Sequence, residues 1–213
     1  MKILHFSVWL IIHLIAVFLL VLFVDKSERQ NSSWDAVFIT KGPFCFHIID
    51  KESVRLVQLS DKKITEPIPS TVEHMGRSYY VRSIGFFSMI KYFDWSDVVI
   101  PDSVESIGVG AFLGAHTLTN ITLSANLDRI NAYAFMWCTE LRSVYFKSDT
   151  PPSISGFRYC HPELTFYYPE EYKSNWPETL NGIPCRPWNP EKSANRLSEE
   201  PEKTEEQRES FSP

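Results

Sequence analysis

The sequence has little of what catalysis and nucleic-acid binding require. Lysine and arginine number 21 against 26 aspartates and glutamates, a net charge of −5, so there is no excess of positive charge to hold a phosphate backbone. The chain contains only 8 glycines and lacks a glycine-rich phosphate loop, His-Glu-x-x-His, Cys-x-x-Cys and Gly-x-Ser-x-Gly. We therefore predict a protein that is not an enzyme. We expect no catalytic, metal-binding or cofactor-binding residue, and no nucleic-acid partner.

One long apolar run is present near the N-terminus. Residues 6–24 carry no formal charge, and as a helix they would span roughly 29 Å, close to the thickness of a bilayer. Residues 1–29 are therefore either a transmembrane anchor or a signal peptide, and the absence of Ala-x-Ala favours the anchor. Both alternatives predict a chain exported to the cell envelope, on the periplasmic or surface side. If the segment is cleaved, the protein would be secreted.

The opposite end has a very different composition. Residues 186–213 are rich in Pro, Glu, Ser, Lys and Arg and contain almost no aliphatic side chains. Such a segment cannot bury enough apolar surface to offset the entropy lost on ordering. We predict a disordered acidic, proline-rich tail.

A repeat of 23 residues organises the middle of the chain. Side chains of the same kind recur at this spacing without a gap, and a fixed period is the mark of stacked repeat units. The sets in register include Val81, Val104 and Leu127; Ile84, Ile107 and Ile130; Val98, Ile121 and Val144; and Met89, Phe112 and Phe135.

Each copy has the internal spacing of a leucine-rich repeat. Leu118-x-x-Ile121-x-Leu123-x-x-Asn126 fits that pattern. The central alternation predicts a short strand with one buried face, and Asn126 falls in the turn after it, where a short polar side chain can bond the backbone. Further on, Ala134-Phe135 is a small-large pair on a predicted helical or 3₁₀ turn, and we expect its aromatic ring to fill the core between coils.

These features predict a β-rich repeat solenoid, because a single unit cannot bury its own apolar face. We expect a short leucine-rich-repeat array of about three 23-residue coils with one parallel sheet. The predicted divisions of the chain are a linker and antiparallel N-terminal β cap at 30–80, the repeats at 81–149, and a strand-helix C-terminal cap at 150–185.

The repeat motifs resemble those of the BspA-type leucine-rich repeat family. The resemblance rests on Ile-Pro-Asp-Ser-Val-Glu-Ser-Ile-Gly at residues 100–108, on Ala134-Phe135-x-x-Cys138, and on Tyr167-Tyr168-Pro169-x-x-x-Tyr172-Lys173-x-x-Trp176. It implies an exported or surface protein like those of Bacteroidales and oral spirochaetes, with a binding or adhesion role. The chain departs from the family pattern at Phe87-Ser88-Met89, and Tyr92 and Ala115 replace the family's cysteine.

The outward face of the predicted sheet is the candidate binding surface. Strand positions that alternate with buried ones face solvent and align across neighbouring coils, an arrangement that repeat proteins use for binding. A solvated face without a ligand is the competing interpretation. The candidate residues are Asp97, Val99, Asn120, Thr122, Ser124, Ser143, Tyr145 and Lys147. The aromatic residues Tyr167, Tyr172 and Trp176 are instead expected to cap the core.

The four cysteines allow three complete pairings in an exported chain. Cys138 occupies the interior cysteine position of the repeat and is expected to pack as a small buried residue. Cys160 and Cys185 flank the C-terminal cap and are the candidate disulfide pair.

Two functions follow as expectations. The first is a non-catalytic protein- or glycan-interaction module exposed at the bacterial cell envelope, of the adhesion or recognition type. The alternative is a structural or assembly scaffold of an envelope complex that docks through its caps or its tail. In either case the N-terminal segment would contact the membrane.

Overall fold

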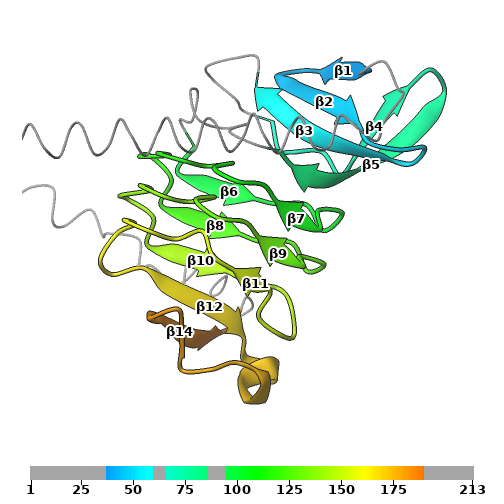
Figure 1. The fold of residues 1–213 in the computed structure, drawn as a ribbon. Helices are drawn as coiled ribbons and strands as arrows, with labels where there is room; N and C mark the ends of the chain where they lie inside the picture. Colours follow the sequence, from blue (N-terminus) through cyan, green and yellow to red (C-terminus); the bar gives the residue numbers. More distant parts are fainter. Residues whose placement is uncertain (1–36, 60–65, 86–94, 190–213) are drawn as a thin grey trace, which may run out of the picture.

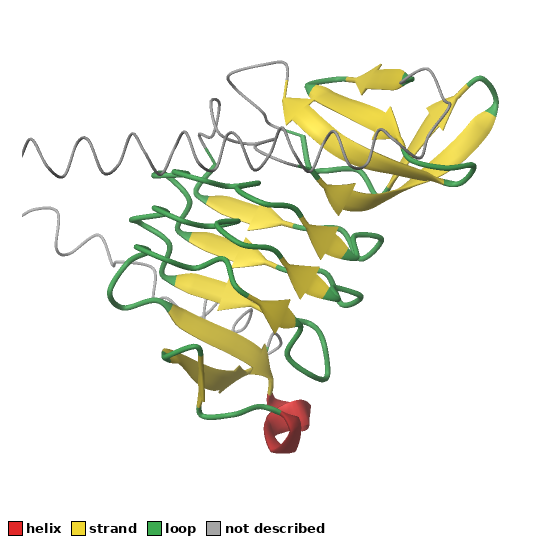
Figure 2. Ribbon diagram, viewed as in Figure 1, coloured by secondary structure: helices red, strands yellow, loops and turns green. Residues whose placement is uncertain are grey.

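The protein is a β-solenoid: a stack of similar coils below a curved N-terminal cap (Figure 1). The computed structural model describes residues 37–59, 66–85 and 95–189. Strands and turns make up nearly all of this part, with one short helix near its C-terminal end (Figure 2). The predicted repeat solenoid is confirmed.

Five strands form the N-terminal cap. Strands β1, β2 and β3 are antiparallel neighbours, and β4 and β5 form a hairpin around Met75–Gly76. The cap is not wholly antiparallel, however, because β3 pairs with β5 in parallel. This pairing sets the strand direction that the coils continue. The bounds are β1 (Phe38–Lys41), β2 (Phe44–Ile48), β3 (Ser53–Leu59), β4 (Thr71–His74) and β5 (Arg77–Ile84).

Each coil contributes two strands, so the expectation of one parallel sheet is wrong in this respect. Sheet 1 joins the cap strands to β7 (Ser106–Ile107), β9 (Arg129–Ile130) and β11 (Ser153–Ile154). Sheet 2 contains β6 (Asp97–Val99), β8 (Asn120–Thr122), β10 (Ser143–Tyr145), β12 (Thr165–Pro169), β13 (Thr179–Leu180) and β14 (Ile183–Trp188). There are two sheets because each coil has buried apolar side chains on two sides of the core, and a strand forms at each of them.

The two sheets account for two of the 23-residue sets. Val98, Ile121 and Val144 are directly paired in sheet 2, and they are buried. Ile84, Ile107 and Ile130 are paired in the same way in sheet 1. Coils of equal length place equivalent residues one above the other, and this makes the core continuous.

Aromatic rings fill the core between successive coils, as predicted. The rings of Phe112 and Phe135 are stacked with centroids 4.9 Å apart, and Phe157 continues the stack at 4.7 Å from Phe135. The small residues Ala111 and Ala134 are fully buried beside them. Of the expected helical or 3₁₀ turn, the structure has single hydrogen-bonded turns with i→i+3 bonds, such as that from Cys138 N–H to the Phe135 carbonyl oxygen.

The array continues into the segment assigned to the C-terminal cap. Phe157-x-x-Cys160 repeats Phe135-x-x-Cys138, and Phe166 pairs with Val144. The 23-residue period does not reveal this further coil, because its spacing departs from 23. Ile154 lies 24 residues after its partner Ile130, whereas Phe157 lies 22 after Phe135.

The C-terminal cap is a strand, a 3₁₀ helix and a returning hairpin. The helix η1 (Glu170–Asn175) is interrupted by non-helical angles at Tyr172. Trp176 follows it and is buried, with its ring 5.2 Å from that of Tyr168. Strand β14 lies parallel to β12 and extends to Trp188. The predicted tail boundary at 186 is therefore wrong by a few residues, because pairing with β12 orders residues 186–188.

None of the helices in the described residues is long and apolar enough to span a bilayer. The predicted N-terminal segment at 6–24 lies outside this part of the chain, as do residues 190–213 of the predicted tail.

Candidate functional site

Six of the eight predicted binding residues lie side by side on the outward face of sheet 2. Asp97, Asn120 and Ser143 form one row across β6, β8 and β10, and Val99, Thr122 and Tyr145 form the next. Both rows continue into β12, through Thr165 and Tyr167. We call these eight positions the sheet-2 face.

The first row of the sheet-2 face is polar, and two of its side chains are hydrogen-bonded to each other. Asn120 Nδ2 donates a hydrogen bond of 2.8 Å to Asp97 Oδ1, one coil away. The second row begins with Val99, an apolar side chain that is 58% exposed. The face therefore combines hydrogen-bonding groups with accessible apolar surface.

An aromatic cluster closes the second row. The rings of Tyr145 and Tyr167 are stacked with centroids 5.0 Å apart, and Trp188 meets Tyr145 edge-on at 5.0 Å. Tyr167 was expected to cap the core, but it faces outward because it alternates with the buried Phe166 and Tyr168. That alternation was visible in the sequence. Trp188 could not be found there, because it reaches the face only through the return of β14.

Ser124 and Lys147 do not belong to this face. Ser124 is 1% exposed and accepts a hydrogen bond from the backbone N–H of Asn126. Lys147 Nζ lies 3.0 Å from Asp102 Oδ1, in the turn after β6. Although partial burial opposes it, the backbone N–H of Ala125 and the ammonium of Lys147 hold the pKa of Asp102 below its ordinary value.

The four cysteines are free thiols in the structure, so Cys160 and Cys185 are not bridged. Cys138 is fully buried, as expected, and its Sγ contacts the carbonyl oxygen of Phe112 at 3.1 Å. Cys160 repeats this contact one coil later, with the carbonyl oxygen of Phe135 at 3.1 Å. Burial raises the pKa of both thiols, that of Cys160 to about 12. Neither is therefore a nucleophile near neutral pH.

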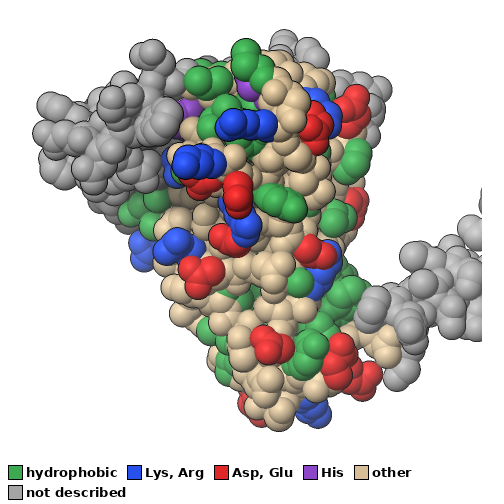
Figure 3. All heavy atoms as spheres, turned by 90° about the vertical axis from the view of Figure 1, so that its right-hand side faces the viewer, with side chains coloured by type: hydrophobic (Ala, Val, Ile, Leu, Met, Phe, Trp, Pro, Cys, Tyr) green, Lys and Arg blue, Asp and Glu red, His purple; other side chains and the backbone are tan. Residues whose placement is uncertain are grey.

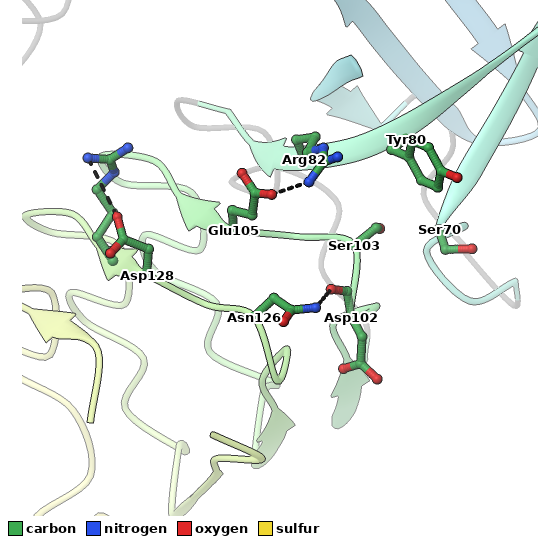
Figure 4. Close-up of a pocket in the computed structure, with 9 residues that line it drawn as sticks. Ser70, Tyr80, Arg82, Asp102, Ser103, Glu105, Asn126 and Asp128 are labelled. Carbon is green, nitrogen blue, oxygen red and sulfur yellow. Dashed lines mark hydrogen bonds and ion pairs between the residues drawn. The ribbon is translucent and has the colours of Figure 1, made fainter. Parts of the chain in front are cut away.

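A polar groove of about 830 Å³ lies where the cap meets the first coils (Figure 4). Its walls come from β5 and the turns that follow β6 and β8, which the repeat stacks above one another. We call this surface the groove. It is lined by Ser70, Tyr80, Arg82, Asp102, Ser103, Glu105, Asn126, Asp128 and Arg129.

Contacts within the groove hold several of these groups in place. The Arg82 guanidinium forms an ion pair with Glu105 and lies over the Tyr80 ring, 5.4 Å from its centroid. Asn126 Nδ2 donates a hydrogen bond of 2.8 Å to the carbonyl oxygen of Asp102. Arg82–Glu105 and Asp102–Asn126 are joined by dashed lines in Figure 4. None of the lining residues is among the candidates predicted from the sequence, because their side chains meet only in the stacked coils.

No cluster of three or more His, Cys, Asp or Glu suited to a metal ion occurs in the part of the chain that the structure describes. Acidic and basic side chains intermingle on the face shown in Figure 3, without a broad patch of one sign. What this arrangement offers chemically is binding through side-chain hydrogen bonds, aromatic contact and local ion pairs.

A solved structure of similar fold agrees with the coil geometry. The chain is similar to a leucine-rich repeat protein from Bacteroides capillosus, with 28% identity, a TM-score of 0.56, and coverage of 62% of this chain and 97% of that one. It also resembles a leucine-rich cell surface protein from Faecalibacterium prausnitzii, with 20% identity, a TM-score of 0.47, and coverage of 64% of this chain and 46% of that one. No curated protein matches the sequence.

The family assignment rests on a sequence profile that covers the cap hairpin and the coils. The profile described as "BspA type Leucine rich repeat region" matches residues 68–174 in six copies. Solenoids of this kind generally form interaction scaffolds with extended binding surfaces. The chain belongs to the BspA-type leucine-rich repeat family.

Proposed function

We propose that this protein is a non-catalytic interaction module of the cell envelope that captures a protein or glycan partner on the sheet-2 face. The observation that carries the proposal is the aromatic cluster of Tyr145, Tyr167 and Trp188 at the end of two aligned rows of accessible side chains. Tyrosine and tryptophan supply large contact areas and polar tips, which is why they dominate binding hot spots.

The rigidity of the coils supports this use of the face. Paired strands lie about 4.8 Å apart, so each row presents one side chain per coil at a fixed interval. The backbone of β10 is held between β8 and β12, and a partner therefore meets a surface that is ordered before binding. Less conformational entropy is lost on association with such a surface.

Exposure at the cell envelope is part of the proposal. It is supported by the apolar run at residues 6–24 and by the exported character typical of the family. Intact-mass analysis of the native protein after membrane fractionation tests it. We expect membrane-associated chain of full mass, or exported chain that lacks the N-terminal segment. Full-length chain in the cytoplasmic fraction would contradict envelope exposure.

Capture by the sheet-2 face is tested in two steps. A photoreactive amino acid at Thr122 is crosslinked in native cells to identify the partner. The purified partner is then titrated against the wild type, against Thr122→Asp/Tyr145→Ala and against the control Met75→Ala, whose side chain is 90% exposed on the cap. We expect affinity to fall at least about tenfold in the double variant and to stay unchanged in the control. Equal affinity in all three would rule out this face.

A scaffold role is the second candidate, and one observation favours it. Val37, Phe38 and Ile49 are 44%, 56% and 42% exposed at the β1–β2 end of the cap, where Ile48 N–H donates to the Val37 carbonyl. We infer from these exposed apolar side chains a candidate docking surface at this end of the cap. The variants Phe38→Asp and a deletion of 190–213 separate the two functions. Loss of an envelope complex in either variant, with partner capture by sheet 2 retained, favours the scaffold.

A further inference from the structure

We propose that the groove at the junction of cap and coils is a binding site for a neutral oligosaccharide. This inference goes beyond the sheet-2 face and does not depend on it, because the two surfaces share no residue. The repeat itself builds the groove: Tyr80, Ser103 and Asn126 are spaced by 23 residues, and so are Arg82, Glu105 and Asp128. Two rows of polar groups therefore run from coil to coil, as required for a ligand made of repeating units.

Four backbone N–H groups at the groove are already used, so an added peptide strand cannot pair with them. In the turn after β8, Ala125 N–H donates to Asp102 Oδ1 and Asn126 N–H to Ser124 Oγ. Asp128 N–H donates to the Glu105 carbonyl, and Glu105 N–H donates to that of Arg82. Strand addition depends on free backbone donors and acceptors. With these donors engaged, we assign most of the recognition in the groove to its side chains.

The charges around the groove cancel, and this selects for a neutral ligand. Asp102 is paired with Lys147, Glu105 with Arg82, and Asp128 with its neighbour Arg129, at 3.8 Å. A polyanion such as a nucleic acid would need an unpaired basic surface, and a polycation would need an unpaired acidic one. Hydroxyl groups both donate and accept hydrogen bonds, so they fit a mixed set of carboxylates, amide and guanidinium groups.

Tyr80 supplies the apolar part of the site. Its side chain is 49% exposed at one end of the groove, and Asp128 lies toward the other end in Figure 4. The Arg82 guanidinium lies over the ring and is itself held by Glu105. A sugar ring has an apolar C–H face and a polar rim of hydroxyls, so an accessible aromatic ring beside polar side chains matches both parts.

The hydrogen-bonding groups left over point to the same class of ligand. Asn126 uses its Nδ2 on the Asp102 carbonyl, and its Oδ1 remains available as an acceptor. Asp128 pairs with Arg129 through Oδ2, which leaves Oδ1 of this 73% exposed side chain as an acceptor. The volume of about 830 Å³ falls within the roughly 300–1,000 Å³ of ordinary ligand sites. The groove is therefore large enough for several sugar units.

A glycan microarray that carries neutral and anionic oligosaccharides, probed with the full chain, tests the proposal. We expect binding to at least one neutral oligosaccharide and none to sulfated or uronic-acid glycans. The best neutral oligosaccharide is then titrated against Tyr80→Ala and against Asp128→Asn, an exposed and isosteric change. Each should weaken binding about tenfold or more, whereas the control Met75→Ala, an exposed residue outside the groove lining, should not. Tyr145→Ala is titrated beside them to test the sheet-2 face.

Three results would overturn the proposal. One is the absence of binding to any neutral glycan on the array by a protein with an intact melting transition. A second is preferential binding of anionic glycans, and a third is unchanged affinity in both groove variants. Loss of binding in Tyr145→Ala alone would place the glycan on the sheet-2 face, which supports the proposed function but not this site.

Discussion

Lys147 reaches back across two coils to Asp102, with 3.0 Å between Nζ and Oδ1. The backbone N–H of Ala125, in the coil between them, donates to the same carboxylate oxygen at 3.0 Å. One carboxylate oxygen therefore links three successive coils. Lys147 was predicted to contact a binding partner. In the structure its ammonium instead forms an ion pair that joins coils of the stack, at the edge of the groove.

The Lys147→Met variant should raise the pKa of Asp102 toward its ordinary value. The pKa is now depressed, so the carboxylate stabilises the fold above its unfolded pKa of 3.8, and that contribution is lost as the pH falls through the lower folded value. The variant should have a smaller contribution to lose, and its loss should be complete at a higher pH, because its folded pKa lies closer to the unfolded one. An NMR titration of the Asp102 carboxyl carbon measures this, with Lys173→Met as the control. An unchanged pKa would show that Ala125 alone holds the carboxylate.

Removal of the central ring of the aromatic stack should destabilise the whole array. The Phe135 ring is buried between Phe112 and Phe157, and a Phe→Ala change at such a site costs about 3–5 kcal/mol. Urea unfolding of Phe135→Ala measures the loss in the free energy of unfolding. The exposed Met75→Ala serves as the control and should change it by less than about 0.5 kcal/mol. A similar small loss in Phe135→Ala would refute the stack as a core element.

Gly114→Ala tests a backbone conformation that recurs in three successive coils. Gly114 has a φ of +69°, and the equivalent residues Trp137 and Tyr159 have φ values of +62° and +58°. An added Cβ at Gly114 meets no atom closer than 3.7 Å, so the cost is conformational, about 1–2 kcal/mol for an L residue in this region. Thermal unfolding against the exposed control Glu140→Ala measures it. A stabilised Gly114→Ala variant would contradict the left-handed assignment.

The buried thiols should make the fold sensitive to alkali. Their raised pKa values mean that the unfolded chain releases protons first, so stability is intact below the unfolded pKa of 9.0. It should then decline as the pH rises toward the folded value of Cys160, about 12. The free energy of unfolding between pH 8 and pH 11 measures this decline. The double variant Cys138→Ala/Cys160→Ala should lose less stability over this range. An equal decline in the variant and the wild type would show that the two thiols do not cause it.

Two truncations distinguish the last strand from the segment after it. A chain that ends at Asn189 keeps β14 and should melt like the full chain. A chain that ends at Gly182 loses the β12–β14 pairing and uncovers Phe166 and Tyr168, which are now buried. We expect a clearly lower melting temperature for the shorter chain. Equal melting of both truncations would show that β14 contributes nothing to the core.

Some elements were readable from the sequence because they repeat at constant spacing. The sheet-2 ladder of Val98, Ile121 and Val144 follows from a 23-residue period alone. The sheet-1 strands could not be predicted in this way, because a strand of two residues such as Ser106–Ile107 is too short to show alternation. The further coil that contains Phe157 was missed for another reason. Insertions and deletions in its turns shifted the period, although the strand contacts were preserved.

The sequence by itself determined that equal coils stack, which residues face the core and which positions of β6, β8 and β10 face outward. Periodicity is enough for this, since identical spacing forces equivalent residues into register. Only the tertiary structure decided what those outward residues meet. Trp188 joins Tyr145 after the chain has left the array and returned, and Arg82, Glu105 and Asp128 form one groove only when coils are superimposed. Contacts between residues far apart in sequence depend on the path of the chain in space, and residue spacing alone does not record that path.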